Sequence, residues 1–469
     1  MRGIRLIGII NVLINFLALG LSIILLFRFS LRQGPISLFN FFYIDSLSAF
    51  FIFTISTVTF ASSLYSVSYI NRGIKEETVS LKKAGFYYLC FNLFTSTMYF
   101  VTVVNNLGIL WVAIEMTTLI SAFLVGFYNT KESVEAAWKY IIICSVGIIL
   151  ALIGTILFSY ALSLGGGLRS LNWTDMMSVS GQLDKNLLKI AFIFILVGYG
   201  TKAGLAPMHT WLPDAHSQAV APISALLSGV LLKTAIYAIL RFGIIMNRSL
   251  GESSHYVSNL LILLGLISLV VSCGFILVQK DIKRLLAYSS IEHVGIIALG
   301  FGIGGPFGIM GGLLHIFNHA VTKSLMFFSA GNIVSVYKKH NMRMIRGVLG
   351  SMPFTGAMAL IGVFALAGMP PFSIFISEMM VIFSAFSKGA YLTAVLALFS
   401  IVIIFAGIIY HFTRMIFGKV PKQMKVFREP LSSKMAFTFL LFMICVFGLS
   451  MPWVFKNIIN SVTLIMRGA

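Results

Sequence analysis

Long apolar segments follow one another along almost the whole chain, separated by short polar stretches. A helix needs about 20 mostly apolar residues to cross the hydrocarbon core of a bilayer. Two segments also contain helix-breaking residues, Pro207 in one and the run from Gly368 to Phe372 in the other. The pattern therefore predicts thirteen spanning helices, of which the sixth and eleventh are broken, at 4–28, 45–69, 86–104, 107–128, 134–161, 187–217, 222–246, 257–279, 282–302, 308–337, 352–388, 390–417 and 434–459.

The composition indicates the same class of protein. The chain is 58% hydrophobic and 10% charged, whereas a soluble globular protein carries about 25% charged residues. We therefore predict an all-α polytopic membrane protein. The first segment follows two arginines, as a signal peptide does, but its apolar run exceeds the roughly 7–15 residues of a signal-peptide core. We expect this helix to be retained.

The net charge of +20 is spread over short loops between apolar segments. This arrangement is typical of topology signals and gives no basis for a nucleic-acid partner. When the N-terminus and every even-numbered loop are placed on one side, that side receives most of the lysines and arginines. The positive-inside rule then predicts a cell-membrane protein with a cytoplasmic N-terminus and an outside C-terminus.

The cysteines offer no redox or metal motif. Cys90, Cys144, Cys273 and Cys445 stand alone, each within an apolar run. Without a CxxC or a Cys/His spacing, we expect no iron–sulfur cluster, no zinc site and no disulfide framework. Any redox chemistry is therefore expected on other subunits, with no cofactor in this chain.

The two broken helices suggest an internal duplication. The predicted units are N-terminal helices in 1–85, a five-helix block in 86–246, a second block in 257–417 and a C-terminal helix in 434–469. In each block the fourth helix is broken. Because five is odd, successive copies must be inverted, as in many transporters. The alternative is that two kinked helices arose without duplication.

The first break, KAGLAPMHTWLPDAHSQAVAP, organises the chemistry. Ionisable groups beside interrupted backbone in an apolar region usually mark an ion path, because burying them in lipid is costly. The alternative is a soluble loop between two spans. The residues that we expect along the path are Glu115, Lys202, Lys233, His315, His319, Lys323 and Glu378, with His209, Asp214, His216, Glu292 and His293 as accessory candidates.

These residues alternate in sign and come from successive helices, a pattern that suits proton hopping. His315, His319 and Lys323 recur every four residues, so one helix face carries them over about 12 Å. Each residue also has a structural interpretation, as a buried ion pair, a core hydrogen bonder or a helix cap. Asp45 is expected to be interfacial, and Arg241 is expected to extend its charge to the membrane surface.

Three stretches carry a family resemblance. KAGLAPMHTWLPDAHSQAVAPISALLSGVLLKTAIYAILRF, DIKRLLAYSSIEHVGII and HIFNHAVTKSLMFFSAGNI resemble the antiporter-like, proton-translocating subunits of respiratory complex I, Mrp antiporters and membrane-bound hydrogenases. NNLGILWVAIEMTTLISAFLVGFY, EAAWKYIIICSVGIILALIGT and GMPPFSIFISEMM are most similar to component F of hydrogenase-4 and formate hydrogenlyase. The resemblance runs from about residue 45 to 417.

The resemblance implies a role for each position. Glu115 pairs with Lys202, and Lys233 passes protons toward the centre of the membrane. The basic residues of 315–323 link two half-channels, and Glu378 lies in the second broken helix. The chain departs from the family pattern of fourteen core helices by one, and it lacks room for a long lateral helix.

The resemblance also implies partners. They are other antiporter-like subunits, small membrane subunits and a peripheral redox module that holds Ni–Fe and Fe–S centres. The transported ion is the proton, with sodium exchange left open. Two alternatives stand beside this hypothesis. One is an Mrp-like secondary cation/proton antiporter without a redox partner, and the other is a structural scaffold.

Overall fold

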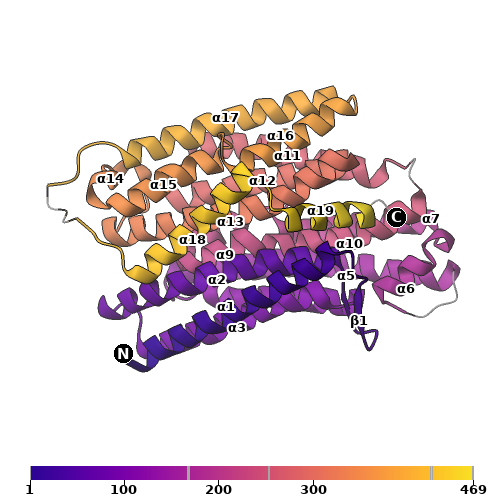
Figure 1. Ribbon diagram of the computed structural model, residues 1–469, viewed down its shortest axis with the longest axis horizontal. Helices are drawn as coiled ribbons and strands as arrows, with labels where there is room; N and C mark the ends of the chain where they lie inside the picture. The colour runs from indigo at the N-terminus through magenta and orange to yellow at the C-terminus, as the bar shows by residue number, and fades with distance from the viewer. Residues whose placement is uncertain (1, 166–169, 252–253, 423, 425, 467–469) are drawn as a thin grey trace.

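The computed structural model describes residues 2–165, 170–251, 254–422, 424 and 426–466. Its helices run side by side along the longest axis of the molecule (Figure 1). Ten of the helices in the described ranges are long and apolar enough to cross a membrane. The chain is therefore an all-α, multi-pass membrane protein, as predicted. The count of thirteen is not confirmed, because several further helices are either shorter or more polar than that measure requires.

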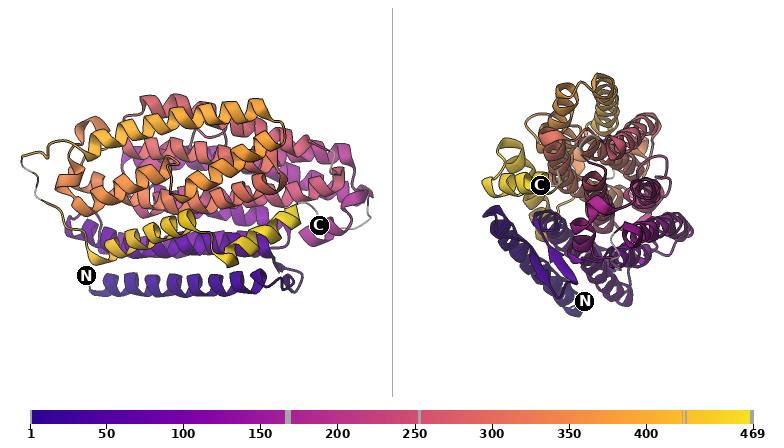
Figure 2. Two further views of the ribbon diagram at one scale, coloured as in Figure 1. Left: turned by 45° about the horizontal axis from the view of Figure 1, so that its top comes forward. Right: turned by 90° about the vertical axis from the view of Figure 1, so that its right-hand side faces the viewer.

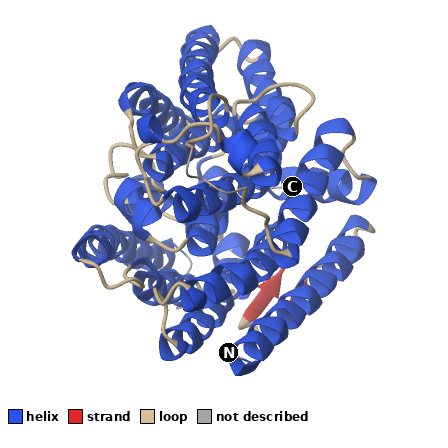
Figure 3. Cartoon of the chain, turned by 90° about the vertical axis from the view of Figure 1, so that its left-hand side faces the viewer, coloured by secondary structure: helices blue, strands red, loops and turns tan. Residues whose placement is uncertain are grey.

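The N-terminal half contains α1 to α10. Apart from a 3₁₀ turn at Ser180–Gln182 and a π-turn at Leu227–Leu231, its elements are α1 (Arg2–Ser30), β1 (Ile36–Leu38), β2 (Phe42–Ile44), α2 (Ser46–Lys75), α3 (Leu81–Val103), α4 (Leu107–Val125), α5 (Lys131–Gly165), α6 (Trp173–Ser178), α7 (Lys185–Ala203), α8 (Leu212–Gln218), α9 (Ala221–Leu226) and α10 (Leu232–Leu250). The strands form a small antiparallel hairpin between α1 and α2, with Ser37 opposite Tyr43. Figure 3 shows the hairpin beside α1 in an otherwise helical molecule.

The C-terminal half contains α11 to α19. With a 3₁₀ turn at Met342–Met344, its elements are α11 (Tyr256–Val278), α12 (Ile282–Ile303), α13 (Gly305–Tyr337), α14 (Val348–Ser351), α15 (Pro353–Leu366), α16 (Ser373–Ser387), α17 (Tyr391–Ile416), α18 (Leu431–Leu449) and α19 (Trp453–Met466). The last predicted helix, 434–459, is therefore wrong as a single element. Pro452 lacks the N–H that a helix needs, and Ser450 is extended.

Both predicted breaks are present, and a glycine ends the first half of each. Gly204 caps α7 in the left-handed conformation at φ 78°, and Gly368 follows α15 at φ 69°. Glycine adopts such angles without a side-chain penalty. In both blocks the third helix packs against both halves of the broken one, α5 against α7 and α8, and α13 against α15 and α16. That the blocks are inverted copies stays a prediction.

Burial separates an inner group of helices from an outer one. The apolar stretches of α2, α9–α10 and α12 are almost wholly buried, whereas only 28% of that of α1 and 33% of those of α11 and α17 is buried. Seen end-on in Figure 2, α1 lies at the outside of the bundle. The inner helices carry buried ionisable residues, and the apolar side chains of the outer helices cover the lipid-facing surface. α1 begins at one end of the bundle and α19 ends at the other (Figure 1).

Candidate functional site

The first ionisable pair is joined through a threonine. Glu115 on α4 is half-buried, and its carboxylate accepts hydrogen bonds from Ser145 (2.7 Å) and Thr118 (3.2 Å). Lys202 on α7 is fully buried, and its ammonium donates to the Thr118 hydroxyl at 2.7 Å and to the Tyr140 hydroxyl at 2.6 Å. Thr118 thus accepts from the lysine and donates to the glutamate. The resemblance implied a pair, and the structure places one hydroxyl between its members.

A buried histidine lies next along the bundle. His216 on α8 is fully buried, and neither ring nitrogen has a hydrogen-bond partner among the described side chains and backbone. Its ring centroid lies 6.0 Å from that of Trp211 and 5.9 Å from that of Phe327 on α13. Trp211 in turn packs on the Tyr140 ring. Because buried polar atoms rarely lack partners, we expect ordered water at His216. The histidine therefore stands between the Lys202 pocket and the core of α13.

A widened helical turn positions the central lysine. The π-turn Leu227–Leu231 precedes Lys233, whose ammonium donates to the Ser228 carbonyl at 2.5 Å. The same ammonium lies 2.6 Å from Nδ1 of His319 on α13. π-turns of this kind occur frequently at functional sites. Lys233 is fully enclosed in the bundle, so its side chain does not reach a membrane surface.

A line of side chains continues from His319 to α16. The rings of His319 and His293 lie 4.7 Å apart, and each has an Nε2 atom without a partner among the described residues. His293 Nδ1 lies 3.0 Å from His315 Nε2, and His315 Nδ1 lies 2.9 Å from Ser377 Oγ. Donor atoms of His293, His315 and Glu378 lie within 4.8 Å of one another. The structure thus brings together five predicted residues from α10, α12, α13 and α16, namely Lys233, His293, His315, His319 and Glu378.

This cluster suits a proton better than a metal ion. Zn²⁺ with nitrogen ligands at about 2.0–2.1 Å needs donor atoms roughly 3.3 Å apart around an open centre. Here the two imidazoles already hydrogen bond to each other, and Ser377 occupies the other nitrogen of His315. The arrangement matches a chain along which imidazoles accept a proton on one nitrogen and release it from the other.

Four predicted residues lie beside this line. Lys323 donates to the Leu286 carbonyl at 2.7 Å, and Glu292 accepts from Ser289 at 3.3 Å, both inside the bundle. Asp214 lies near the surface in ion pairs with Lys139 and Arg284. His209 packs near Phe275 on α11. The two buried charges can influence the line electrostatically, whereas Asp214 holds α8 against its neighbours.

A cavity of about 590 Å³ opens at the end of the bundle where α1 begins. On its wall, the buried ammonium of Lys283 donates to the carbonyls of Ser217 (3.3 Å) and Ala219 (2.8 Å), directly after His216. His340 also lines it. Burial lowers the pKa of His340 and Lys283 adds to this effect, although Asp281 opposes it. Lys283 therefore marks the inner wall of the cavity and His340 its rim.

The prediction that Arg241 extends to the surface is wrong. Its guanidinium forms a bidentate ion pair with Asp45, with both N–O distances 2.7 Å, and both side chains are buried. Tyr237 and Ser48 accept further hydrogen bonds from it, and its charge lies 4.6 Å from the Trp173 ring. A partner on another helix compensates for the loss of water around the buried charge. The pair locks α10 to the start of α2.

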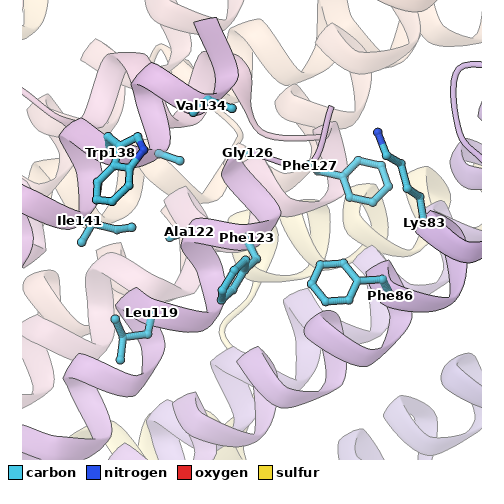
Figure 4. Close-up of a pocket in the computed structure, with 11 residues that line it drawn as sticks. Lys83, Phe86, Leu119, Ala122, Phe123, Gly126, Phe127, Val134, Trp138 and Ile141 are labelled. Atoms are coloured by element: carbon cyan, nitrogen blue, oxygen red, sulfur yellow. The ribbon is translucent and has the colours of Figure 1, made fainter. Parts of the chain in front are cut away.

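None of these ionisable residues lines the groove in Figure 4, although Leu119 on its wall lies one helical turn from Glu115. It has a volume of about 430 Å³ between α3, α4 and α5, and among the described residues Lys83 is its one charged lining residue. Phe86, Phe123 and Trp138 line much of the remainder, and all three side chains are more than a third exposed. An exposed apolar lining of this kind suits contact with lipid or with another protein.

Sequence reasoning missed the hydroxyl groups that connect the ionisable residues. Thr118 joins Lys202 to Glu115, Tyr140 accepts from Lys202, and Ser377 bonds to His315. Nothing in the pattern distinguishes them from other hydroxyl residues of apolar helices, most of which bond back to their own helix, as Thr117 does to Ile114.

Comparison with known proteins gives a consistent result. Residues 104–404 match the family described as NADH:quinone oxidoreductase/Mrp antiporter, transmembrane. The hydrogenase-4 component F homolog of Methylacidiphilum infernorum is 43% identical over 83% of this chain and 80% of its own length. Hydrogenase-4 component B of Escherichia coli is 35% identical over 71% of this chain and 49% of its own length.

The fold also matches a solved structure. A chain of the membrane-bound sulfane sulfur reductase, an archaeal respiratory membrane complex, superposes with a TM-score of 0.84 at 24% identity. The match covers 99% of this chain and 91% of the other. At this level of identity the likeness establishes the shared fold.

Proposed function

The chain belongs to the NADH:quinone oxidoreductase/Mrp antiporter transmembrane family, and we propose that it translocates protons as a membrane subunit of a complex I-like redox complex. The observation that carries this proposal is the line of buried side chains from Lys233 through His319, His293 and His315 to Glu378. Interior ionisable groups in a membrane protein are costly and persist mainly for function.

Protons enter this line from the end with the basic loops. The cavity beside Lys283 reaches the backbone next to His216, and among the described residues His216 has two unpartnered ring nitrogens inside the bundle. From there a proton reaches Lys233, passes along the three histidines and leaves by way of Glu378. Water completes the gaps at the unpartnered nitrogen atoms, as it does at buried polar sites generally.

The Glu115–Thr118–Lys202 unit is the coupling element. Glu115 is half-buried, so a charge or side chain on a neighbouring subunit can approach it. A change there alters how strongly Thr118 and the carboxylate hold the Lys202 ammonium, and Lys202 then gives its proton to Lys233. Two states of this unit with different energies are required.

We further propose where the metal centres lie, how the chain is oriented and which ion it transports. The Ni–Fe and Fe–S centres lie in partner subunits. By the positive-inside rule the end where α1 begins is cytoplasmic and the end where α19 stops is outside. The proton is the transported ion, because four of the five residues of the line, Lys233 and the three histidines, offer nitrogen atoms, whereas a hard cation such as sodium prefers oxygen ligands.

The alternative is an Mrp-like cation/proton antiporter without a redox partner. Purification of the tagged protein in mild detergent, with mass spectrometry and metal analysis, separates the two. Iron and nickel subunits recovered together with the chain support the redox complex. Recovery with small membrane subunits and no metal supports the antiporter.

The transport proposal is tested with Lys202→Ala. The purified complex is reconstituted in vesicles that contain a pH-sensitive dye, and proton uptake is followed after the partner subunits are given a reductant and an acceptor. We expect the variant to assemble normally and to lose proton uptake while electron transfer continues. Normal uptake in the variant would remove Lys202 from the path.

A further inference from the structure

A second charged feature lies at the end of the bundle where α1 begins, on the lipid-facing side. A groove of about 370 Å³ separates the C-terminal ends of α11 and α17. Lys280, Arg343 and Arg414 line it, and no carboxylate does so in the part of the chain that the structure describes. Three cations therefore share one small opening.

These cations are not compensated by the protein. Among the described residues, no ion pair of 4.0 Å or less involves any of the three, and Arg414 donates to the neutral hydroxyl of Tyr410. Other cations at the same end do have carboxylate partners, such as Lys338 with Glu76. Lys82, Lys83 and Lys339 at the same end have no such ion pair either, so the groove is distinguished by three cations that share one opening with no carboxylate among its described lining residues.

The two walls of the groove, the ends of α11 and α17, are fixed relative to each other. His411 on α17 donates from Nε2 to the carbonyls of Ile276 (3.1 Å) and Leu277 (3.3 Å) at the end of α11. Met342 on the 338–347 loop is buried and forms the floor. The opening is therefore built by three separate segments and does not depend on one flexible side chain.

Apolar surface begins directly beside the cations. Leu277 and Val278, which line the groove, are 51% and 70% exposed on α11. The apolar surface extends along α17 to Val402 and Phe399, 58% and 65% exposed and about 18–22 Å from Arg414 along the helix. Arg414 lies in the last turn of the spanning helix α17, with Tyr410 one turn before it. Basic residues and tyrosines at this level of a membrane protein contact lipid headgroups.

We propose that this groove binds the phosphodiester of an anionic membrane phospholipid, with the acyl chains lying along the exposed faces of α11 and α17. The adjoining apolar stripe favours a lipid over an acidic peptide, which would satisfy the cations and leave that stripe uncovered. The groove of Figure 4 has a single described cation in its lining, Lys83. A lipid bound there should show little preference for an anionic headgroup, so this groove serves as an internal comparison.

The test is native mass spectrometry of the full chain, with whatever subunits remain bound in mild detergent, titrated with phosphatidylglycerol or with phosphatidylcholine of the same acyl chains. Each cation near a membrane surface contributes about a fivefold preference for anionic lipid, so three give about 100-fold. We expect K280Q/R343Q/R414Q to lose at least about tenfold of the preference for phosphatidylglycerol.

Two controls keep the result interpretable. K82Q/K131Q/K339Q removes the same charge from exposed lysines at the same end that line neither groove, and is expected to leave the tight site unchanged. K280R/R343K/R414K keeps the charges and is expected to keep the preference, which excludes misfolding as the cause. An equal loss in the first control would overturn the proposal. So would displacement of the lipid by glycerol phosphate, or cross-linking of an acidic partner segment in its place.

Discussion

The hydroxyl of Thr118 is the only atom that touches both Lys202 and Glu115 among the hydrogen bonds of the described residues. Thr118→Val has nearly the same shape and removes that atom. Lys202 then keeps one partner, Tyr140, and leaving a buried donor unpaired costs about 1–3 kcal/mol. We expect proton uptake to fall by about 100-fold or more, as for loss of a positioned proton-transfer group.

The serine variant is the control, because Thr118→Ser keeps the hydroxyl. It should retain most of the uptake, measured in the same vesicles and normalised to the amount of assembled complex. If the valine variant pumped as well as the serine variant, Lys202 and Glu115 would communicate by another route.

The histidines offer a second comparison at the residue scale. His319 contacts Lys233 on one side and the His293 ring on the other, whereas His209 lies off the line near Phe275. We expect His319→Gln to abolish uptake and His209→Gln, a buried residue outside the line, to leave it within about twofold. Vesicle uptake at matched protein concentration measures both. Equal loss in the two variants would indicate a general packing defect.

Charge against an apolar background was enough to predict the ionisable residues from sequence. Glu115, Lys202 and Lys233 each interrupt a helix that is otherwise fit for lipid. Their connections were not predictable, since Thr118 and Ser377 are ordinary residues in such helices. The partner of Arg241 was not predictable either, because Asp45 is 196 positions away and only the fold brings the two together.

At the scale of elements, the glycine after α15 positions a functional side chain. The carboxylate of Glu378 lies where a Cβ at Gly368 would be, and Gly368 also has φ 69°. We expect Gly368→Ala to displace Glu378 and to stop proton release in the vesicle assay. The left-handed backbone alone costs about 1–2 kcal/mol with any other residue.

Gly389 separates the two effects. It has φ 72°, and no neighbouring atom lies within 4 Å of the position that an alanine Cβ would take, so Gly389→Ala carries the backbone cost alone. We expect this variant to lose stability by a similar amount and to keep proton uptake. If both variants lost uptake equally, strain in the turn would explain the result and the placement of Glu378 would not.

Helix breaks were predictable where residue chemistry forces them. Pro207 and the Gly368–Phe372 run gave both interior breaks. Pro452 carried the same signal near the C-terminus, but the surrounding apolar run favoured one long helix, and α18 and α19 are separate. The π-turn before Lys233 could not be predicted, because its sequence, LSGVL, is compatible with an ordinary helix.

The ion pair between α2 and α10 fixes how two inner elements pack. Asp45→Asn keeps the cap of α2, since asparagine also accepts from Ser48, but it leaves the Arg241 charge buried and unpaired. We expect a loss of about 3–5 kcal/mol in unfolding free energy, measured by denaturant titration in detergent. The double variant Asp45→Asn with Arg241→Met should recover part of this loss, and no recovery would mean that the pair itself is not the source.

The whole molecule is asymmetric along its length. The cavity beside Lys283 and the groove lined by Lys280, Arg343 and Arg414 both open at the end where α1 begins. The hairpin at 36–44 and the Asp45–Arg241 pair lie toward the other end (Figure 1). On the proposed path protons enter at the end that carries this cavity, so the direction of transport follows from the orientation of the chain.

That orientation is testable by labelling single cysteines in intact cells, after the four native cysteines are replaced by serine or alanine. Gly34 precedes the hairpin with open space around it, and Lys82 is exposed at the opposite end of the bundle. With the basic loops in the cytoplasm, a membrane-impermeant maleimide should label Gly34→Cys directly and Lys82→Cys only after permeabilisation. The reverse pattern would place the cavity beside Lys283 outside, so that protons entering through this cavity would move toward the cytoplasm.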